Sequence, residues 1–321
     1  MTSFLRTSLL AIAASLSLIG GAQAQNNVTR MVVAFPPGGP VDLVGRILAQ
    51  QLSEELGERV IVENRAGANG NIGADTVARG PADGTVMLLT SVGAVAVSPA
   101  LYETLPYDPA KDFAPVSLVV NNAELFVVNP SNPATDAKDF VARSKTAKQA
   151  VAIGSSGVGS IPHLTMELFA AASGANVLHV PYKGAAPVIN DVMGNQVAGF
   201  FGDVPGVINF VKGGKLKAIG IASPKRHPLL PDVKTLGELG IKDVESNNWY
   251  GIVVPAKTPK ATIDKLNAAV RKSLGNDAVR SKLIALGTEP APSTPDELGK
   301  LMASDTAKWG GLIKAKNIKA E

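Results

Sequence analysis

A turn at residues 35–42 carries the residue types that hold anions. Its sequence is FPPGGPVD, and it stands between an apolar, strand-like run at residues 31–35 and a helical pattern. Gly38 and Gly39 allow the backbone to approach a ligand closely, and Pro40 suits the first position of a helix because it has no N–H to leave unpaired. A negative group at this turn would meet outward-pointing N–H donors and the positive end of the helix dipole. The same pattern also fits a plain strand-to-helix turn that binds nothing.

Further turns that follow other strand-like runs offer similar groups. They combine glycines with small hydroxyls, which leave room for a ligand at the carboxyl edge of a sheet. One of these hydroxyls, on Ser160, can also cap the next helix. The candidate contacts from these turns are Ser91, Gly93, Ser155, Ser156, Ser160, Tyr182, Gly184 and Ala185.

The glycine-rich segment at residues 67–73 imitates a dinucleotide-binding loop. Its glycines are spaced three and three apart, whereas the G-x-G-x-x-G pattern requires two and three. No acidic residue follows a later strand at the distance that a ribose contact would need. The segment is therefore better interpreted as a turn than as a nucleotide site.

The residues that could catalyse a reaction do not form a recognisable pattern. His163 could act as a general base with Asp42, Asp83 or Asp203, but a neutral, hydrogen-bonded histidine is the simpler interpretation. The nucleophile elbow, the P-loop and the H-E-x-x-H motif are absent, and no two histidines have metal-ligand spacing. We therefore predict no catalytic residue, no metal and no cofactor.

The elements that position these turns follow an α/β pattern. Nine strand-like runs alternate with helical stretches, which favours largely parallel sheets. Two helices have clear start signals, Thr258-Pro259 and the capping box at residues 294–297. A chain of this length exceeds what one core usually serves, so two lobes are expected. We expect strands to cross between them near residues 118–128 and 244–254.

The N-terminal segment and the composition indicate an exported protein. Residues 1–24 contain one arginine, an apolar stretch and an Ala-Gln-Ala end, which is typical of a signal peptide cleaved after Ala24. Its removal lowers the net charge from +4 to +3, too little for a nucleic-acid surface. The chain has no cysteine, which excludes thiolate chemistry and disulfides. The periplasm is the compartment that fits best.

Taken together, the motifs resemble those of the periplasmic substrate-binding receptors of tripartite tricarboxylate transporters. The resemblance covers the whole mature chain and rests on the order and spacing of eight segments: FPPGGPVDLVGR (35–46), VENRAGANGNIGAD (62–75), DGTVMLLTS (83–91), LYETLPYDPAKDFAPVSLV (101–119), GSSGVGSIPHL (154–164), PYKGAAP (181–187), GKLKAIGIAS (214–223) and LPDVKTLGELG (230–240).

The resemblance implies a type II periplasmic-binding-protein fold, in which two α/β lobes close on a ligand like a hinged trap. It divides the chain into a first lobe of residues 25–122 and 249–321 and a second lobe of residues 123–248. It also implies a monomer that binds a di- or tricarboxylate, an amino acid or an aromatic carboxylate and delivers it to membrane transporter subunits. The site residues carried over are Phe35, Pro36, Gly38, Gly39, Asp42, Ser91, Gly93, Ser155, Ser156, Ser160, His163, Tyr182, Gly184, Ala185 and Asp203.

Two departures from the family pattern touch the expected pocket. Pro40 and Val41 stand where small or hydroxyl residues are common, and Gly202 separates Phe201 from Asp203. Asp203 either meets a ligand amine, an amide or a water, or caps the helix ahead of Pro205. A secreted α/β enzyme and a sensing receptor for a membrane signalling protein are the alternative functions.

Overall fold

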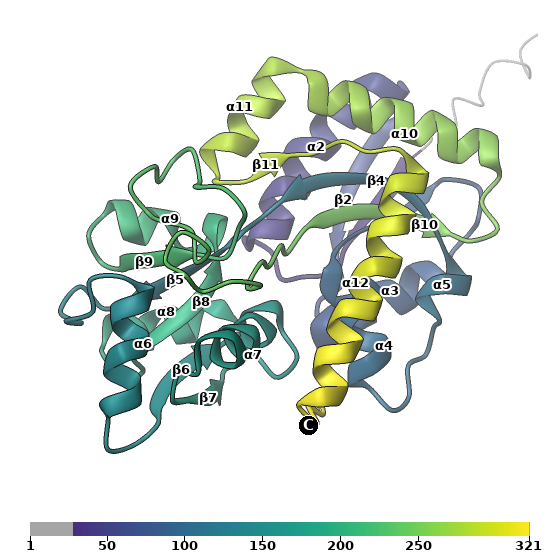
Figure 1. Cartoon of the computed structure of the whole chain (residues 1–321). Helices are drawn as coiled ribbons and strands as arrows, with labels where there is room; N and C mark the ends of the chain where they lie inside the picture. Colours follow the sequence, from purple (N-terminus) through teal and green to yellow (C-terminus); the bar gives the residue numbers. More distant parts are fainter. Residues whose placement is uncertain (1–27, 321) are drawn as a thin grey trace, which may run out of the picture.

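The computed structural model describes residues 28–320, which form two α/β lobes (Figure 1). The predicted signal peptide and its cleavage site after Ala24 lie outside the described residues. Within residues 28–320, no helix is both long enough and apolar enough to cross a membrane.

The first lobe is built on a six-stranded sheet with the order β11-β4-β10-β3-β1-β2. Both ends of the described chain contribute to it, because β1 begins at its first residue and β10 and β11 come from its last third. The strands are β1 (Val28–Val33), β2 (Arg59–Asn64), β3 (Val86–Ser91), β4 (Phe113–Asn121), β10 (Tyr250–Pro255) and β11 (Glu289–Pro290).

Helices cover both faces of this sheet, and each face has its own apolar core. One core is covered by α2 (Pro40–Leu56), α10 (Lys260–Gly275) and α11 (Asp277–Ala285). The other is covered by α3 (Asn71–Ala78), the π-turn η2 (Gly93–Val97), α4 (Ser98–Leu101) and α12 (Pro295–Ala315). The short elements η1 (Ala68–Gly70) and α5 (Pro109–Asp112) complete the lobe. The predicted capping box is confirmed at the start of α12, where Thr294 and Glu297 bond each other's backbone N–H.

The second lobe is built on a five-stranded sheet with the order β7-β6-β8-β5-β9. Its two apolar cores also lie on opposite faces of the sheet. Its elements are β5 (Glu124–Val128), α6 (Ala137–Thr146), β6 (Val151–Ser155), α7 (Ile161–Ser173), β7 (Val177–Pro181), α8 (Ala185–Met193), β8 (Gly199–Asp203), α9 (Val204–Lys212) and β9 (Lys217–Ile221).

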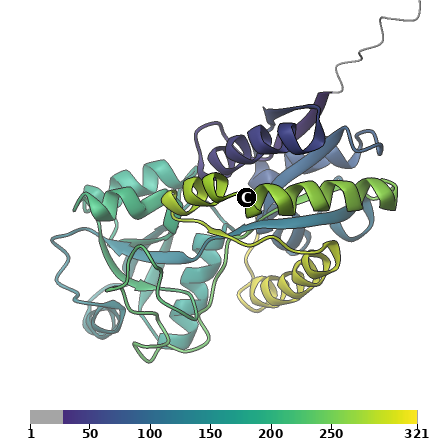
Figure 2. The same cartoon turned by 90° about the horizontal axis from the view of Figure 1, so that it is seen from above.

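Both sheets are mixed, although the alternating pattern predicted largely parallel ones. β1 pairs in parallel with β2 and β3, whereas β10 runs antiparallel to both β3 and β4. In the second sheet, β5 runs antiparallel to β8 and β9. The reversed strands adjoin the passage between the lobes: β4 leads into β5 (Figure 2), and the chain returns from the second lobe into β10. The direction of a strand relative to its neighbours depends on which distant segments pair, and local hydrophobic periodicity does not encode that pairing.

Four asparagines tie the two crossing segments to each other. Asn122 N–H donates to Asn247 Oδ1 at 2.9 Å, and Asn122 Nδ2 donates to the Asn248 carbonyl at 2.9 Å. Asn247 Nδ2 donates to Asn121 Oδ1 at 2.7 Å. A β-bridge between Ala123 and Asn247 adds backbone pairing. We refer to Asn121, Asn122, Asn247 and Asn248 as the asparagine crossing.

The lobes also meet away from the asparagine crossing. Ile161 and Leu164, at the start of α7 in the second lobe, pack in a core of the first lobe together with Leu101. Beyond the end of α12, Lys316 forms an ion pair with Glu167 of α7 at 3.3 Å. Figure 1 shows α12 running down the first lobe toward α7.

Candidate functional site

The turn at residues 34–40 joins β1 to α2, as the sequence predicts. Gly38 has a φ of +77°, a conformation that favours glycine. Gly39 is the N-cap of α2 without a side-chain cap, and Pro40 takes the first helical position. Phe35 is half-buried and Pro36 is exposed at the surface of the turn.

Asp42 is buried next to this turn, with 1% of its surface exposed. Its carboxylate accepts hydrogen bonds from Gly38 N–H at 2.9 Å, Arg46 Nε at 2.9 Å and Asn64 Nδ2 at 2.8 Å. Burial alone would raise the pKa of Asp42, but the three hydrogen bonds outweigh it and lower that pKa below its ordinary value. Asp42 is therefore ionised and engaged within the protein, in a position to fix the turn.

The N–H donors differ from those that the sequence suggests. The amide of Gly38 is bonded to Asp42, and the amide of Gly39 donates to the Pro36 carbonyl at 3.3 Å. Within residues 28–320, the amides of Val41 and Asp42 have no acceptor, because they lie in the first turn of α2. Any anion at this turn would meet those two amides and the helix dipole, while the glycines shape the turn.

Two other loops of the first lobe converge on the same turn. A Cβ at Gly70 would lie 3.4 Å from Phe35 and 3.3 Å from Ala94. Ser91 ends β3 and accepts a hydrogen bond from Gly93 N–H at 3.3 Å. The predicted contacts Phe35, Ser91 and Gly93 thus come from loops that meet at one sheet edge.

Asn69 belongs to this group, and the sequence analysis missed it. A Cβ at Gly93 would lie 2.8 Å from Asn69 Oδ1, so only glycine leaves room for the Asn69 amide. Asn69 Nδ2 is buried and has no acceptor among the described residues. The sequence feature that could have identified Asn69 is an asparagine inside a glycine-rich loop, because asparagine tolerates the positive φ of 55° found here.

In the second lobe, Ser155 and Ser160 shape the turn between β6 and α7. Ser155 Oγ donates to the Gly157 carbonyl at 3.0 Å and accepts from Gly157 N–H at 3.1 Å. Ser160 caps α7 by accepting from His163 N–H at 3.4 Å, and it donates to the Gly157 carbonyl at 2.7 Å. Ser156 stands between them, and its carbonyl accepts from Gly184 N–H at 3.2 Å.

A stacked pair of histidines supports this turn. The rings of His163 and His179 lie 3.6 Å apart at an angle of 5°. His163 Nδ1 accepts from Gly159 N–H at 3.0 Å, and His179 Nε2 lies 2.6 Å from Ser155 Oγ. Burial, followed by the neighbouring His179, lowers the pKa of His163 to about 3, and burial lowers the pKa of His179 to about 4. Both rings are therefore neutral at pH 7, as the sequence interpretation of His163 expects.

The turn before α8 lies beside the histidine-supported turn. Tyr182 N–H donates to the Ser155 carbonyl at 3.0 Å. The Tyr182 hydroxyl donates to Asp191 at 2.6 Å, and burial followed by that bond raises the pKa of Tyr182 to about 12. Gly184 is the N-cap of α8 with no side-chain cap and a φ of +104°, and Ala185 begins the helix. This helix start resembles that of α2.

Asp203 lies at the junction of β8 and α9, beside the asparagine crossing. It occupies the N-cap position of α9, but its side chain does not cap the helix. Its carboxylate accepts from Asn248 Nδ2 at 3.0 and 2.9 Å and from the Tyr250 hydroxyl at 3.1 Å. The alternative of a capping side chain is therefore wrong, because the Asp203 side chain bonds to the crossing segment and to β10.

Two close approaches join the first and second lobes near these turns. A Cβ at Gly206 of α9 would come within 4.0 Å of Pro40 Cγ, so the starts of α2 and α9 face each other closely. A Cβ at Gly159 would lie 2.2 Å from Leu101 Cδ2, so the histidine-supported turn also touches the first lobe.

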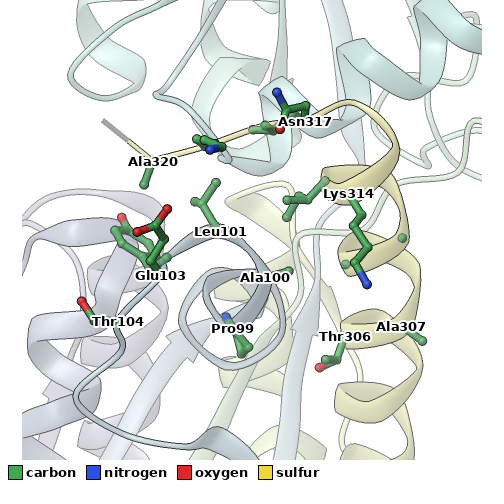
Figure 3. Close-up of a pocket in the computed structure, with 16 residues that line it drawn as sticks. Pro99, Ala100, Leu101, Glu103, Thr104, Thr306, Ala307, Lys314, Asn317 and Ala320 are labelled. Atoms are coloured by element: carbon green, nitrogen blue, oxygen red, sulfur yellow. The ribbon is translucent and has the colours of Figure 1, made fainter.

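Two cavities lie away from the predicted site residues. One, of about 900 Å³, lies between the loop after α4 and the end of α12 and includes Glu103 and Lys314 (Figure 3). The other, of about 380 Å³, lies at the lobe junction near Asn121, His227 and Lys308. Among the residues that the structure describes, no group of three His, Cys, Asp or Glu side chains could hold a metal ion.

The sequence matches the family model for the tripartite tricarboxylate transporter family receptor over residues 44–318. The chain is 35% identical to the protein BugT of Bordetella pertussis over 291 residues, which covers 90% of this chain and 89% of BugT. This is a family of receptors, which agrees with a binding protein and argues against the alternative of a secreted enzyme.

Solved structures agree with this match. A structure described as a periplasmic transporter shares 36% identity and a TM-score of 0.84, covering 94% of this chain and 100% of that one. The R. palustris protein Rpa4515, solved with adipate, shares 31% identity and a TM-score of 0.85, covering 91% and 98%. MatC of Rhodopseudomonas palustris, solved with malate, shares 29% identity and a TM-score of 0.80, covering 89% and 99%. The chain belongs to the family of tripartite tricarboxylate transporter receptors.

Proposed function

We propose that this protein captures a small carboxylate between its lobes and delivers it to a membrane transporter of the tripartite tricarboxylate type. The observation that carries the proposal is the approach of the starts of α2 and α9, with Pro40 opposite Gly206. The start of α2 attracts anions because the Val41 and Asp42 N–H groups have no acceptor among the described residues and the helix dipole is positive there. At the start of α9, the Val204 N–H is already bonded to the Ala123 carbonyl. The adipate and malate in two similar structures are dicarboxylates. A di- or tricarboxylate is the first ligand class to test, followed by amino acids and aromatic carboxylates.

We divide the candidate residues by what their side chains already contact. Asp42, Ser155, Ser160 and His163 are engaged within their own turns, so their role is to position the backbone. Direct contact falls to the backbone amides that begin α2 and α8 and to the small residues around them. Gly38, Gly39, Tyr182 and Asp203 are engaged in the same way and also act as positioning residues. The proposed direct contacts are Phe35, Pro36, Val41, Asn69, Ser91, Gly93, Ser156, Gly184 and Ala185.

This arrangement can supply the energy of binding without a salt bridge. A micromolar ligand requires about 8 kcal/mol at the one-molar standard state. Each hydrogen bond to a charged group contributes about 1.5–3 kcal/mol, so about four to six of them suffice. Contacts from both lobes are needed because the energy of the contacts made on closure must offset the entropic cost of ordering the two lobes around the ligand.

We also propose that the protein works as a periplasmic monomer whose mature chain begins at Gln25. The lobe boundaries at residues 122/123 and 248/249 are part of the same proposal. The two sheets support these boundaries, because among the described residues no strand from β5 to β9 pairs with a strand of the first sheet. N-terminal sequencing of the exported protein and its mass in solution test these points.

The deciding experiment fills the space between α2 and α9. Gly206→Leu places a branched side chain beside Pro40, so we expect it to abolish binding of the dicarboxylate that binds the wild type, with adipate and malate as the first probes in calorimetry. Gly275→Leu is the matched control, because Gly275 is exposed and a Cβ there meets nothing within 4 Å. If Gly206→Leu folds and binds the same ligand with unchanged affinity, the site lies elsewhere.

A further inference from the structure

Glu124 is buried at the hinge without a donor for either of its oxygens. It begins β5 directly after the asparagine crossing, and its exposure is 0%. Among the described residues, neither Oε1 nor Oε2 of Glu124 has a hydrogen-bond donor. The strand register places Glu124 opposite Asp203. A second carboxyl group is therefore the polar neighbour of this buried side chain.

Asp203, by contrast, is well supplied with donors. It accepts from Asn248 Nδ2 and from the Tyr250 hydroxyl, and it lies at the positive end of α9. Asp203 therefore has hydrogen-bond donors from two residues, whereas Glu124 has none among the described residues. The titratable groups that face Glu124 in the described chain are Asp203 from β8 and Tyr250 from β10, and neither brings a positive charge.

An ionised Glu124 would be a second negative charge beside Asp203 with no compensation. Burying such a charge without partners costs far more than keeping its proton. Burial first, and the charge of Asp203 second, raise the pKa of Glu124 well above its ordinary value. A protonated Glu124 would also supply the donor that this pair of carboxyl groups lacks.

We propose that Glu124 keeps its proton at neutral pH and donates it in a hydrogen bond to Asp203, which makes Glu124 a positioning residue for the start of α9. The junction lies between the lobes: Val204 N–H donates to the Ala123 carbonyl at 3.0 Å, and the Tyr250 hydroxyl reaches Asp203 from β10. Loss of the proton would put two charges together and push the junction apart. The protonation state of Glu124 does not depend on the proposed binding of a carboxylate.

The first test uses the wild-type protein with ¹³C-labelled glutamate side chains. One glutamate carboxyl group should give the NMR shift of a protonated acid at pH 7, and Glu124→Gln should remove that signal. Labelling glutamate alone avoids confusion with Asp305, whose pKa burial also raises. A wild-type spectrum in which every glutamate is ionised at pH 7 overturns the proposal. This outcome is read from the wild type alone, so it does not depend on whether a variant folds.

The second test follows the proton through stability. Unfolded Glu124 loses its proton near its ordinary pKa, about 4.3, whereas the folded form keeps it, so rising pH favours unfolding. The unfolding equilibrium constant of the wild type, relative to Glu124→Gln, should therefore increase about tenfold per pH unit between pH 5 and 7. Relative to Glu103→Gln, an exposed control, it should stay constant. A constant ratio to Glu124→Gln contradicts the inference.

The positioning role is tested by hydrogen exchange in the first turn of α9. Glu124→Gln retains an N–H donor for Asp203, so the amides of Val204 and of residues 206–208 should keep wild-type protection. Glu124→Leu has no donor, so those amides should exchange at least tenfold faster. Equal exchange in the two variants overturns the positioning role. Because no ligand is added, failure here is distinguishable from failure of the proposed carboxylate site.

Discussion

The two lobes fix their binding turns by different chemistry. In the first lobe, an ionised and buried carboxylate, Asp42, gathers donors from the turn, its own helix and β2. In the second lobe, neutral groups do this work, because Ser155 and the histidine pair hold the turn before α7. The Asp42 carboxylate forms strong hydrogen bonds but needs all of its donors to stay in place. Ser155 and the two histidines hold their turn only while both rings stay unprotonated. The two turns should therefore fail under different conditions.

The largest expected effect comes from removing the charged anchor. Asp42→Ala leaves Gly38 N–H and Asn64 Nδ2 without their acceptor inside the turn, so we expect a loss of about 3 kcal/mol in unfolding free energy. Urea denaturation measures it. Asp75→Ala, which removes a surface ion pair to the largely solvated Arg79 side chain, is the control and should cost under about 1 kcal/mol. A similar loss in both variants would remove the distinction between the anchors.

A smaller effect is expected where the second turn touches the first lobe. Gly159→Ala combines a φ of +71° with a methyl group 2.2 Å from Leu101 Cδ2. Strain and repacking together should cost about 2 kcal/mol. The double variant Gly159→Ala/Leu101→Ala, compared with Leu101→Ala alone because Leu101 lies in the core, tests the cause by calorimetric unfolding. If Gly159→Ala costs as much without Leu101 as with it, the clash is not the reason and backbone strain alone accounts for the loss.

The neutral turn should weaken first in acid. Because the pKa values of His163 and His179 are lowered to about 3 and about 4, unfolded histidines bind protons below about pH 6.5 while folded ones do not. Stability is complete above that pH and falls as the pH drops toward 4, because the unfolded state then binds more protons than the folded state. The contribution of Asp42, whose pKa is also lowered, is present above about 3.9 and is lost only below it.

Hydrogen exchange measured from pH 7 to 4.5, and corrected for intrinsic rates, checks this order. Amides of β6 and β7 should lose protection before those of β1 and α2. Simultaneous loss in both lobes would mean that the histidines do not set the acid response of the second turn.

The smallest effect concerns Arg46, the most exposed partner of Asp42. Its side chain is 53% exposed, so water replaces much of its bond to Asp42. We expect Arg46→Ala to cost about 0.5 kcal/mol, less than Asn64→Ala at about 1.5 kcal/mol. Chemical denaturation of both variants gives the ranking. The reverse ranking would show that charge, and not buried hydrogen bonding, dominates this anchor.

Much of the fold was predictable because the signals are local. The apolar face and terminal glycine of α2, the proline after Gly39 and the capping box at Thr294 all depend on neighbouring residues. The family resemblance then gave the lobes. Strand direction near the crossing was not predictable, since pairing between β10 and β4 joins segments more than a hundred residues apart.

The candidate site was predictable as a set of turns but not in its bonding. Nothing near Gly38 in the sequence shows that its amide is used by Asp42, because the choice depends on Asn64 from β2 as well. Glu124 was overlooked for the same reason: its meaning comes from a strand register that places it opposite Asp203. Sequence located the groups with ligand-binding chemistry, and three-dimensional contacts assigned their tasks.

The asparagine crossing also limits how the molecule can move. Two adjacent antiparallel connections that are bonded to each other favour rotation of the lobes about one axis and resist twisting. Distances between labels on the two lobes should therefore change along a single coordinate as the protein opens. Asn122→Ala would remove the side-chain hydrogen bond to the Asn248 carbonyl, so the two lobes could twist relative to each other more freely.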